Sequence, residues 1–340
     1  GHFGFDTVWG EDGEFLSDAL RSGWGSLDDG QAGYLHVVPR ILAIGVAGLP
    51  VNLVPLGFLI LTSMIVGFVA LLATRVMTPI MPLNWSKYFF GLAIVALPIS
   101  GAEALGNAAN IQQWLWVGGL MACIGTTSTR WEKIGGDTLL VGAGLSSPLS
   151  VLLLPIVVWR RRHDRATTLL FLIAFSLQAL HALLFGDQRG NPPVGSKSPF
   201  VQAKTFLFWV PNGITAKDQS EWTATGLTFI VVCLILLWVC RHAMTREIWL
   251  LLLLAVVYWF ISTGFGQGAT YRHAVVPGLL VVAAITGIAQ SSRLLTPFAV
   301  TLSVLWLIQL GVWGPRVSGP SWKDAVRAVT VCDATTPLPI

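Results

Sequence analysis

The chain has 340 residues, of which 54% are hydrophobic and 11% are charged, with a formal net charge of +4 and a mean hydropathy of +0.69. A soluble domain has about a quarter of its residues charged, so this composition excludes an ordinary soluble protein and predicts an integral membrane protein. About half of the basic residues lie in short loops between apolar runs, so the charge indicates membrane sidedness and not a nucleic-acid surface. Long apolar runs favour helices over a β-barrel, whose strands would alternate polar and apolar residues. We therefore expect an all-α fold, a polytopic transmembrane helical bundle.

The first segment, residues 1–40, is expected to be an extracytoplasmic loop. It holds a concentration of carboxylates: Asp6, Glu11, Asp12, Glu14, Asp18, Asp28 and Asp29. Apolar residues recur between them at helical spacing, namely Phe15, Leu16, Ala19, Leu20 and Trp24. This pattern predicts an amphipathic helix that lies in the membrane interface. The chain starts at Gly1 without a signal-peptide pattern, so we expect an upstream transmembrane helix to deliver this loop and the sequence to be a fragment.

Glu11 and Asp12 stand out among these carboxylates because Gly10 and Gly13 flank them. Glycines allow the backbone to turn closely around a ligand. A carboxylate at the membrane surface can be a general base for an acceptor hydroxyl or can hold a divalent cation. The alternative is that all these carboxylates are simply solvated on the outer face. We favour a functional role for Glu11 and Asp12 and a solvated rim for the others.

Apolar runs that can provide spans of about 20 residues follow at roughly 41–74 (an interfacial stretch, then a span from about 53), 88–105, 111–127, 137–159, 167–185, 223–240, 247–263, 273–290 and 294–313. If every run crossed the membrane, the basic loops 129–136 and 160–166 would lie on opposite faces, against the preference of Lys and Arg for the cytoplasm. Pro148, within GLSSPLS, interrupts the run 137–159. We therefore predict that this run is a re-entrant pair of half-helices. The transmembrane domain, 41–313, then has eight full spans plus one re-entrant pair.

Two further segments are extracytoplasmic under this topology. The loop 186–222 is long and mixes Pro, Gly and Lys with FLFWV, which is typical of a segment that caps a pocket or covers the outer face. The C-terminal tail 314–340 contains SWKDAV, which predicts a short amphipathic helix capped by Ser321.

Polar residues also gather at the predicted outer ends of the spans. Glu103, Asn107 and Asn110 are spaced by four and three residues, which would place them on one face of a helix end. An ionisable group at the edge of an apolar span is a functional hypothesis by default. The alternative for these residues is a polar helix terminus that meets water.

Tyr271, Arg272 and His273 lie at the outer mouth of another predicted span. Arg matches phosphate oxygens in a bidentate way, and the phosphate of a lipid carrier would arrive at this depth. The alternative is an interfacial Arg that extends toward lipid headgroups. His181 lies near the outer end of an apolar run, where a packed, hydrogen-bonded core histidine is the more common explanation.

Several short stretches together resemble a known family. They are the Glu11–Asp12 pair followed by GYLHVVPR (33–40), EALGNAANIQQW (103–114), the SSP break (146–148), YRHAVVP (271–277) and SWKDAV (321–326). With these motifs the chain resembles the C superfamily (GT-C) of integral-membrane glycosyltransferases that use polyprenyl-phosphate sugars. The resemblance covers most of the chain through short, degenerate motifs. The members it resembles are bacterial cell-envelope glycosyl- or arabinosyltransferases, whose usual first span is absent from this sequence.

The resemblance implies a transferase of the bacterial plasma membrane with its active site facing outside. Its partners would be a polyprenyl-phosphate sugar, a glycan or lipid acceptor and the membrane lipids, without nucleic acid. The base of the family, an acidic residue of the first outer loop, falls on Asp12, with Glu11 as its neighbour. The candidate substrate-binding residues are Glu103, Asn107, Asn110, His181, Tyr271, Arg272 and His273. No metal ligands and no certain cofactor follow from the resemblance, although a divalent cation is compatible with it.

The expected reaction is the attack of an acceptor hydroxyl on the anomeric carbon, with Asp12 accepting the proton and Arg272 holding the lipid phosphate. It would invert the sugar's configuration, and Asp12→Asn should leave folding intact while removing transfer. The alternative is a polytopic transporter or flippase for a lipid-linked or envelope precursor. That class predicts ionisable residues near the bilayer midplane and paired repeats, and neither is evident. A third possibility is a membrane scaffold, which the convergence of Glu11, Asp12, Glu103 and Arg272 would disfavour.

Overall fold

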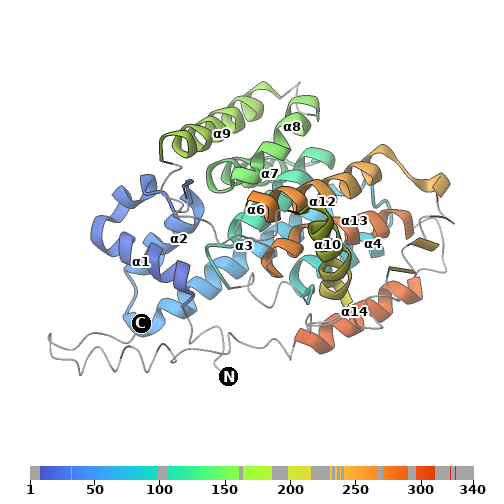
Figure 1. Ribbon diagram of the computed structural model, residues 1–340, viewed down its shortest axis with the longest axis horizontal. Helices are drawn as coiled ribbons and strands as arrows, with labels where there is room; N and C mark the ends of the chain where they lie inside the picture. The colour runs from blue at the N-terminus through green and yellow to red at the C-terminus, as the bar shows by residue number, and fades with distance from the viewer. Residues whose placement is uncertain are drawn as a thin grey trace.

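The computed structural model describes residues 8–31, 33–98, 106–160, 164–185, 198–215, 230–231, 234–235, 238, 241–265, 271–289, 296–310, 322 and 326. These residues form twelve α-helices joined by turns and short 3₁₀ segments, and they contain no β-strand (Figure 1). The predicted all-α class is therefore confirmed for the described part of the chain. Four stretches there are long and apolar enough to cross a membrane: Val51–Val76, Arg165–Phe185, Arg246–Gly264 and Arg272–Ala289. A membrane helical bundle is thus plausible, and the number of eight full spans stays a prediction.

The N-terminal lobe, at one end of the molecule in Figure 1, consists of α1 (Gly10–Ser22), the 3₁₀ segment η2 (Gly23–Asp28) and α2 (Val37–Ala47). The predicted amphipathic helix is present as α1, whose face with Phe15, Leu16 and Ala19 is buried. Leu20 and Trp24 belonged to the same pattern but are 64% and 68% exposed. The apolar stripe is therefore narrower than predicted, because only its central part packs against α2 and the rest of the protein.

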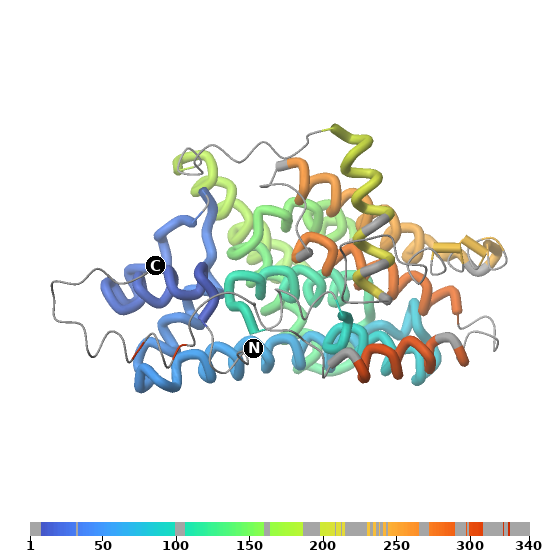
Figure 2. Tube along the Cα trace, turned by 60° about the horizontal axis from the view of Figure 1, so that its bottom comes forward, coloured from blue at the N-terminus to red at the C-terminus, as the bar shows by residue number. Residues whose placement is uncertain are grey.

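The next helices are α3 (Val54–Val76), which follows the 3₁₀ segment η3 (Val51–Leu53), then α4 (Asn84–Ala96), α6 (Ile111–Ile124) and α7 (Arg130–Ser146). α3 runs along one side of the molecule and packs against both α4 and α6 (Figure 2). α6 and α7 approach each other closely at Gly119: a Cβ added there would lie only 3.0 Å from the Cα of Leu140. Small residues allow helix backbones in membrane proteins to pack in this way.

The predicted re-entrant run is a broken helix. It consists of α7, the 3₁₀ segment η4 (Pro148–Leu153) and α8 (Leu154–Arg160), and it is followed by α9 (Arg165–Phe185). Lys133, near the start of α7, forms an ion pair with Asp164, which directly precedes α9. The starts of α7 and α9 therefore lie together. The segment between them leaves the loop at residues 129–136 and comes back to the loop at residues 160–166, as a hairpin would. The depth of this hairpin in a membrane stays a prediction.

Polar contacts fix both ends of α7. The helix begins at Arg130, ahead of the predicted residue 137, because Thr129 and Glu132 form a capping box. The Glu132 carboxylate accepts the Thr129 N–H at 3.0 Å, and the Thr129 hydroxyl accepts the Glu132 N–H at 3.4 Å. At the other end, the hydroxyl of Ser146 accepts the Val38 N–H at 3.0 Å. The break after α7 is thus attached to the N-terminal lobe.

The C-terminal half contains α10 (Pro199–Thr215), η6 (Arg241–Ala243), α12 (Arg246–Phe265), η7 (Tyr271–Ala274), α13 (Val275–Ala289) and α14 (Thr296–Leu310). The prediction that residues 186–222 form a surface loop is wrong for α10, which packs against α12, α13 and α14. Two buried indoles attach it: Trp259 Nε1 donates to the Gln202 carbonyl at 2.9 Å, and Trp306 Nε1 donates to the Ile214 carbonyl at 2.7 Å. The FLFWV stretch therefore belongs to a packed helix.

The predicted span 223–240 and the cap at Ser321 lie mostly outside the described residues. Trp322 and Val326 of the tail are helical. Trp322 Nε1 donates to the Val51 carbonyl at 2.6 Å, which places this part of the tail against the start of α3.

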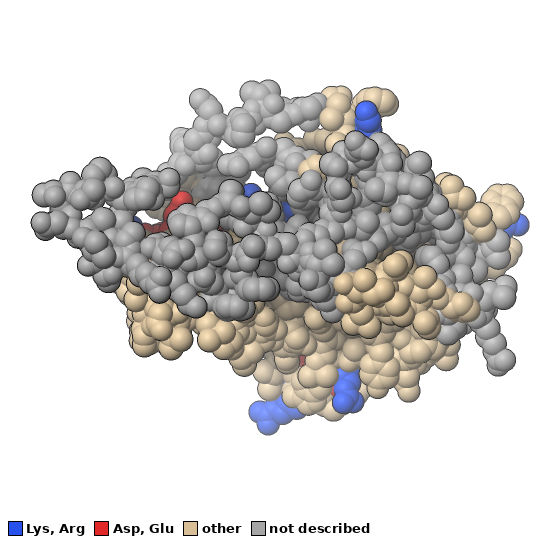
Figure 3. Space-filling view, turned by 90° about the horizontal axis from the view of Figure 1, so that it is seen from below, with Lys and Arg blue, Asp and Glu red and all other residues tan. Residues whose placement is uncertain are grey.

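Large apolar side chains remain exposed on the outer sides of several helices, among them Met64, Leu183 and Trp249. Figure 3 shows a face whose described surface is mostly uncharged, with Lys and Arg projecting at its margins. Soluble monomers rarely expose large contiguous apolar patches. This surface is the one expected of helices that contact lipid.

Candidate functional site

Asp12 lies in the first turn of α1 and is fully buried. Both of its carboxylate oxygens accept hydrogen bonds from the turn that precedes α6. Oδ2 accepts the Ala108 N–H at 3.1 Å, and Oδ1 accepts the Ala109 N–H at 3.0 Å. The start of a helix presents amide groups without intrahelical partners and favours a negative charge. Asp12 therefore fastens the N-terminal lobe to the beginning of α6.

Glu11 lies beside Asp12 but has a different partner. Its Oε1 accepts a hydrogen bond from Arg272 Nη1 at 2.9 Å, and this ion pair joins residues 261 positions apart. The two side chains are 35% and 25% exposed. The second oxygen, Oε2, is buried and has no hydrogen-bond partner among the described residues. The structure thus brings the acidic pair and Arg272 together.

The glycines beside these carboxylates do not act as predicted. Gly10 and Gly13 lie within the first turns of α1, so no glycine turn surrounds a ligand there. The described glycines with positive φ are elsewhere, at Gly23, Gly33 and Gly106. The helix itself positions Glu11 and Asp12, because carboxylates in a first turn interact favourably with the helix dipole.

Asn107 and Asn110 lie in the turn before α6 and not on one helix face, since α6 begins at Ile111. Asn107 Oδ1 accepts the Asn110 N–H at 3.3 Å, and both side chains are buried. The three-residue spacing between Asn107 and Asn110 therefore reflects a turn, which is closed by the hydrogen bond to the Asn107 side chain. The Asn107 Nδ2 has no partner in the described part of the chain. Asp12 binds the main chain of this same turn, so the predicted proximity to the acidic pair holds here.

The remaining predicted residues on this side are placed in part. Tyr271, Arg272 and His273 form η7, directly before α13. Arg272 reaches Glu11, and His273 is partly buried next to it. Glu103 and the side chain of Tyr271 lie outside the described residues.

His181 lies apart from the acidic pair, at the other end of α1. Its imidazole packs on Gly30, where a Cβ would lie only 2.2 Å from the ring's Cε1. The ring lines an open pocket of about 670 Å³ together with residues from the C-terminal end of α1 and the end of η2. The residues predicted as one outer site therefore occupy two places along α1.

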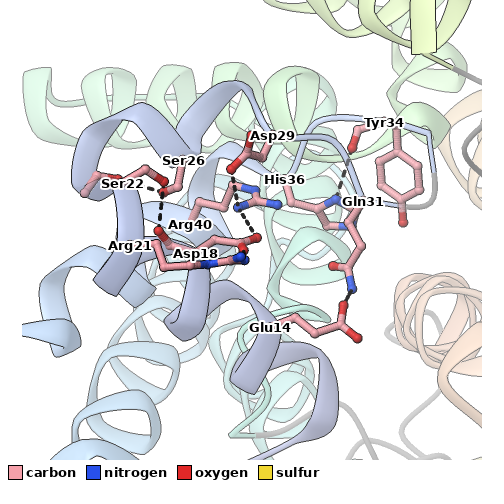
Figure 4. Close-up of polar contacts among 11 residues, drawn as sticks. Glu14, Asp18, Arg21, Ser22, Ser26, Asp29, Gln31, Tyr34, His36 and Arg40 are labelled. Atoms are coloured by element: carbon pink, nitrogen blue, oxygen red, sulfur yellow. Dashed lines mark hydrogen bonds and ion pairs between the residues drawn. The ribbon is translucent and has the colours of Figure 1, made fainter.

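Arg40, in α2, is a buried charge that the sequence did not single out. It is 2% exposed, and its Nη1 donates to Asp18 Oδ2 at 3.0 Å and lies 3.9 Å from Asp29 Oδ2 (Figure 4). Its guanidinium also lies over the Phe15 ring, 5.1 Å from the centroid. Asp18 additionally pairs with Arg21. The prediction of a solvated rim is therefore wrong for Asp18, and the signal available was a single Arg within the apolar stretch VVPRILA.

His36, directly before α2, packs between Phe15 of α1 and Tyr34. Its ring lies 5.3 Å from the Phe15 ring and 4.2 Å from the Tyr34 ring, and its Nδ1 lies 3.3 Å from the Tyr34 carbonyl oxygen. Burial lowers the pKa of His36 from its ordinary 6.5 to about 3, and the nearby Arg40 and His181 act in the same direction. The imidazole is therefore neutral near pH 7 and donates through Nδ1.

The chemistry available at the acidic pair follows from these contacts. A carboxylate with an unpartnered oxygen can accept a proton, and a guanidinium can bind phosphate. Within the described ranges, no group of three or more His, Cys, Asp and Glu side chains is arranged to hold a metal ion. Comparison of the chain with protein-family models, with curated proteins and with solved structures found no match.

Proposed function

We propose that this protein is a membrane glycosyltransferase of the bacterial plasma membrane. It would move a sugar from a polyprenyl-phosphate donor to a glycan or lipid acceptor of the cell envelope on the extracytoplasmic face. The observation that carries the proposal is the ion pair between Glu11 and Arg272 beside the buried Asp12. A proton acceptor and a phosphate-binding group from distant parts of the chain meet at one point and are partly exposed.

The ion pair supports a specific order of events. A donor phosphate that binds Arg272 competes with Glu11, because Arg and phosphate commonly form two parallel hydrogen bonds. The displaced Glu11 carboxylate can then accept the proton of an acceptor hydroxyl. The acceptor oxygen bonds to the anomeric carbon as the bond from that carbon to the phosphate oxygen breaks. Polyprenyl phosphate leaves with the electron pair, and the configuration of the sugar is inverted.

The contacts favour different roles for the two carboxylates. Asp12 is fully buried, and each of its oxygens accepts a main-chain N–H. Both oxygens are thus already engaged in holding the turn before α6. Glu11 retains an oxygen without a partner among the described residues. We therefore assign proton transfer to Glu11 and positioning to Asp12, which exchanges the roles that the resemblance implied.

The experiment is a transfer assay with the purified protein in lipid nanodiscs. Radiolabelled polyprenyl-phosphate hexoses and pentoses are offered one at a time with an envelope extract as acceptor. Wild-type protein should transfer at least one sugar, and Glu11→Gln should lose about 10²–10⁴-fold in rate. Arg75→Lys, an exposed change remote in sequence from the site, is the control and should transfer normally.

Two outcomes would overturn the proposal. One is that wild-type protein transfers none of the sugars, and the other is that Glu11→Gln transfers at the wild-type rate. If the same protein, reconstituted into lipid vesicles, moves the intact lipid-linked sugar across the bilayer without transferring it, a flippase would be supported instead.

A further inference from the structure

A second polar site lies at the C-terminal end of α1, in the open pocket of about 670 Å³. Its lining includes Asp18 and Arg21 from α1, Asp28 at the end of η2, Asp29 directly after η2, and His181 and Phe185 from α9. Its volume lies within the range of about 300–1,000 Å³ that holds small-molecule ligands. At 1.5 Å per residue, Asp18 and Arg21 lie about 10–15 Å along α1 from Glu11.

His181 lines the pocket and has hydrogen-bonding capacity that the described residues leave unused. The side chain is 9% exposed, and its Nδ1 is buried without a hydrogen-bond partner in the described part of the chain. A buried polar atom without a partner destabilises the folded state, so native structures rarely retain one without a reason. Gly30 leaves room for the imidazole, since any larger residue there would collide with it.

The charges of the pocket exclude two classes of ligand. Asp18, Asp28 and Asp29 contribute three carboxylates, whereas Arg21 is the single guanidinium among the described lining residues. The buried Arg40 lies behind two of these carboxylates and leaves the lining acidic. An anion such as phosphate is therefore repelled. A metal ion is not favoured either, because no group of three ligating side chains occurs in the described ranges.

A neutral, hydroxyl-rich ring fits the remaining chemistry. Carboxylates accept hydrogen bonds from hydroxyl groups, and Arg21 can donate to hydroxyl and ring oxygens. Phe185 is 45% exposed, and its ring centroid lies 4.8 Å from that of His181. These two rings form a wall against which the C–H face of a sugar can pack. Donors, acceptors and an aromatic surface together are the set that a carbohydrate requires.

We propose that this pocket binds the body of a neutral oligosaccharide, the acceptor glycan of the transferase. The assignment of the ligand as the acceptor rests on the proposed function, whereas the binding itself does not. A glycan held here would extend along α1 and place its terminal hydroxyl near Glu11. The protein would then prefer an oligosaccharide over the corresponding monosaccharide, because a single ring cannot span both places.

The experiment measures binding directly, with the full chain in nanodiscs and no sugar donor. The probes are neutral linear oligosaccharides of gluco, galacto, manno and arabino configuration, each compared with its monosaccharide by saturation-transfer NMR and thermophoresis. At least one oligosaccharide should bind, more tightly than its monosaccharide. Asp28→Asn and His181→Phe should each weaken binding about tenfold or more, since each removes hydrogen bonds to the ligand. Glu14→Gln, an exposed change on the same helix outside the pocket, should leave binding unchanged.

The variants separate binding from folding and from catalysis. Asp28 is exposed and Phe replaces the imidazole with a ring of similar shape, so both proteins should elute as the wild type does in size-exclusion chromatography. Glu11→Gln should bind the oligosaccharide normally and fail only in transfer. If none of the oligosaccharides binds, or if both pocket variants bind as tightly as wild type, the pocket proposal is overturned even where transfer occurs. Binding without any transfer would overturn the proposed glycosyltransferase activity, whereas the proposal that the pocket binds an oligosaccharide would stand.

Discussion

The substitution Asp12→Asn distinguishes an anchoring carboxylate from a catalytic one. Asparagine retains one carbonyl oxygen and replaces the other oxygen with an NH₂ group, which is a donor. Either the Ala108 or the Ala109 N–H then faces a donor in a fully buried place. One unsatisfied buried group costs about 1–3 kcal/mol, and the remaining hydrogen bond loses its charge assistance, so we expect a total loss of about 2–4 kcal/mol. This is a large fraction of the 5–15 kcal/mol that is typical of a folded protein.

The measurement is a denaturation curve of the purified protein in mixed micelles, with transfer activity recorded on the same samples. Asp12→Asn should shift the midpoint to lower denaturant, whereas Asp28→Asn, the same chemical change at an exposed carboxylate, should not. Glu11→Gln should lose activity with little shift, because Glu11 is partly exposed and the amide oxygen can still accept from Arg272. An Asp12→Asn protein that is as stable as wild type but inactive would refute the anchoring role. Asp12, and not Glu11, would then be the general base.

Three further predictions follow from other contacts. Arg272→Lys should raise KM for the lipid-linked donor about tenfold, since Lys cannot form the two parallel hydrogen bonds that Arg forms with phosphate. An unchanged KM would show that Arg272 does not bind the donor phosphate. Acidification from pH 7 to pH 5 should destabilise the protein by about 2 kcal/mol through His36, because its folded pKa of about 3 lies below the ordinary 6.5 and the unfolded chain gains the proton first. Stability is then lost as the pH falls through 6.5, and a His36→Phe protein with the same pH profile would contradict this. The double variant Lys133→Cys/Asp164→Cys, in a chain without its native cysteines, should be cross-linked by a short thiol reagent, because the two positions are in contact. If it is cross-linked no faster than a control variant with one cysteine on α7 and one on α14, the hairpin is contradicted.

The order of apolar runs and basic loops predicts much of the helical layout. α9 and α12 begin and end within a few residues of the predicted runs, because each is a long apolar run without an internal proline. The hairpin from α7 to α9 was inferred from the two basic loops and from Pro148, and the ion pair between Lys133 and Asp164 brings the starts of α7 and α9 together. α10 was missed because Pro, Gly and Lys flank its apolar centre. What stabilises it is the pair of indole donors from Trp259 and Trp306, which come from distant segments and leave no local signal.

The sequence predicted that Glu11, Asp12 and Arg272 lie on one side of the molecule, but it did not predict how the surrounding side chains are arranged. Counting charges placed Glu11 and Arg272 on one face, and they form an ion pair. Counting could not show that Asp18 binds the buried Arg40, because pairing depends on how α1 and α2 pack. Nor could it show that His181 lies at the other end of α1, since residues at the same depth can be separated within the plane of the membrane.

The ion pair between Glu11 and Arg272 also determines when the site can exist during synthesis. The two residues are 261 positions apart, so at about 5–20 residues per second the ribosome needs on the order of tens of seconds to supply the second after the first. During that interval the N-terminal lobe has no access to its cationic partner. A nascent chain that stops before η7 would carry the carboxylates without the guanidinium, and the proposed activity could begin only after synthesis has passed Arg272.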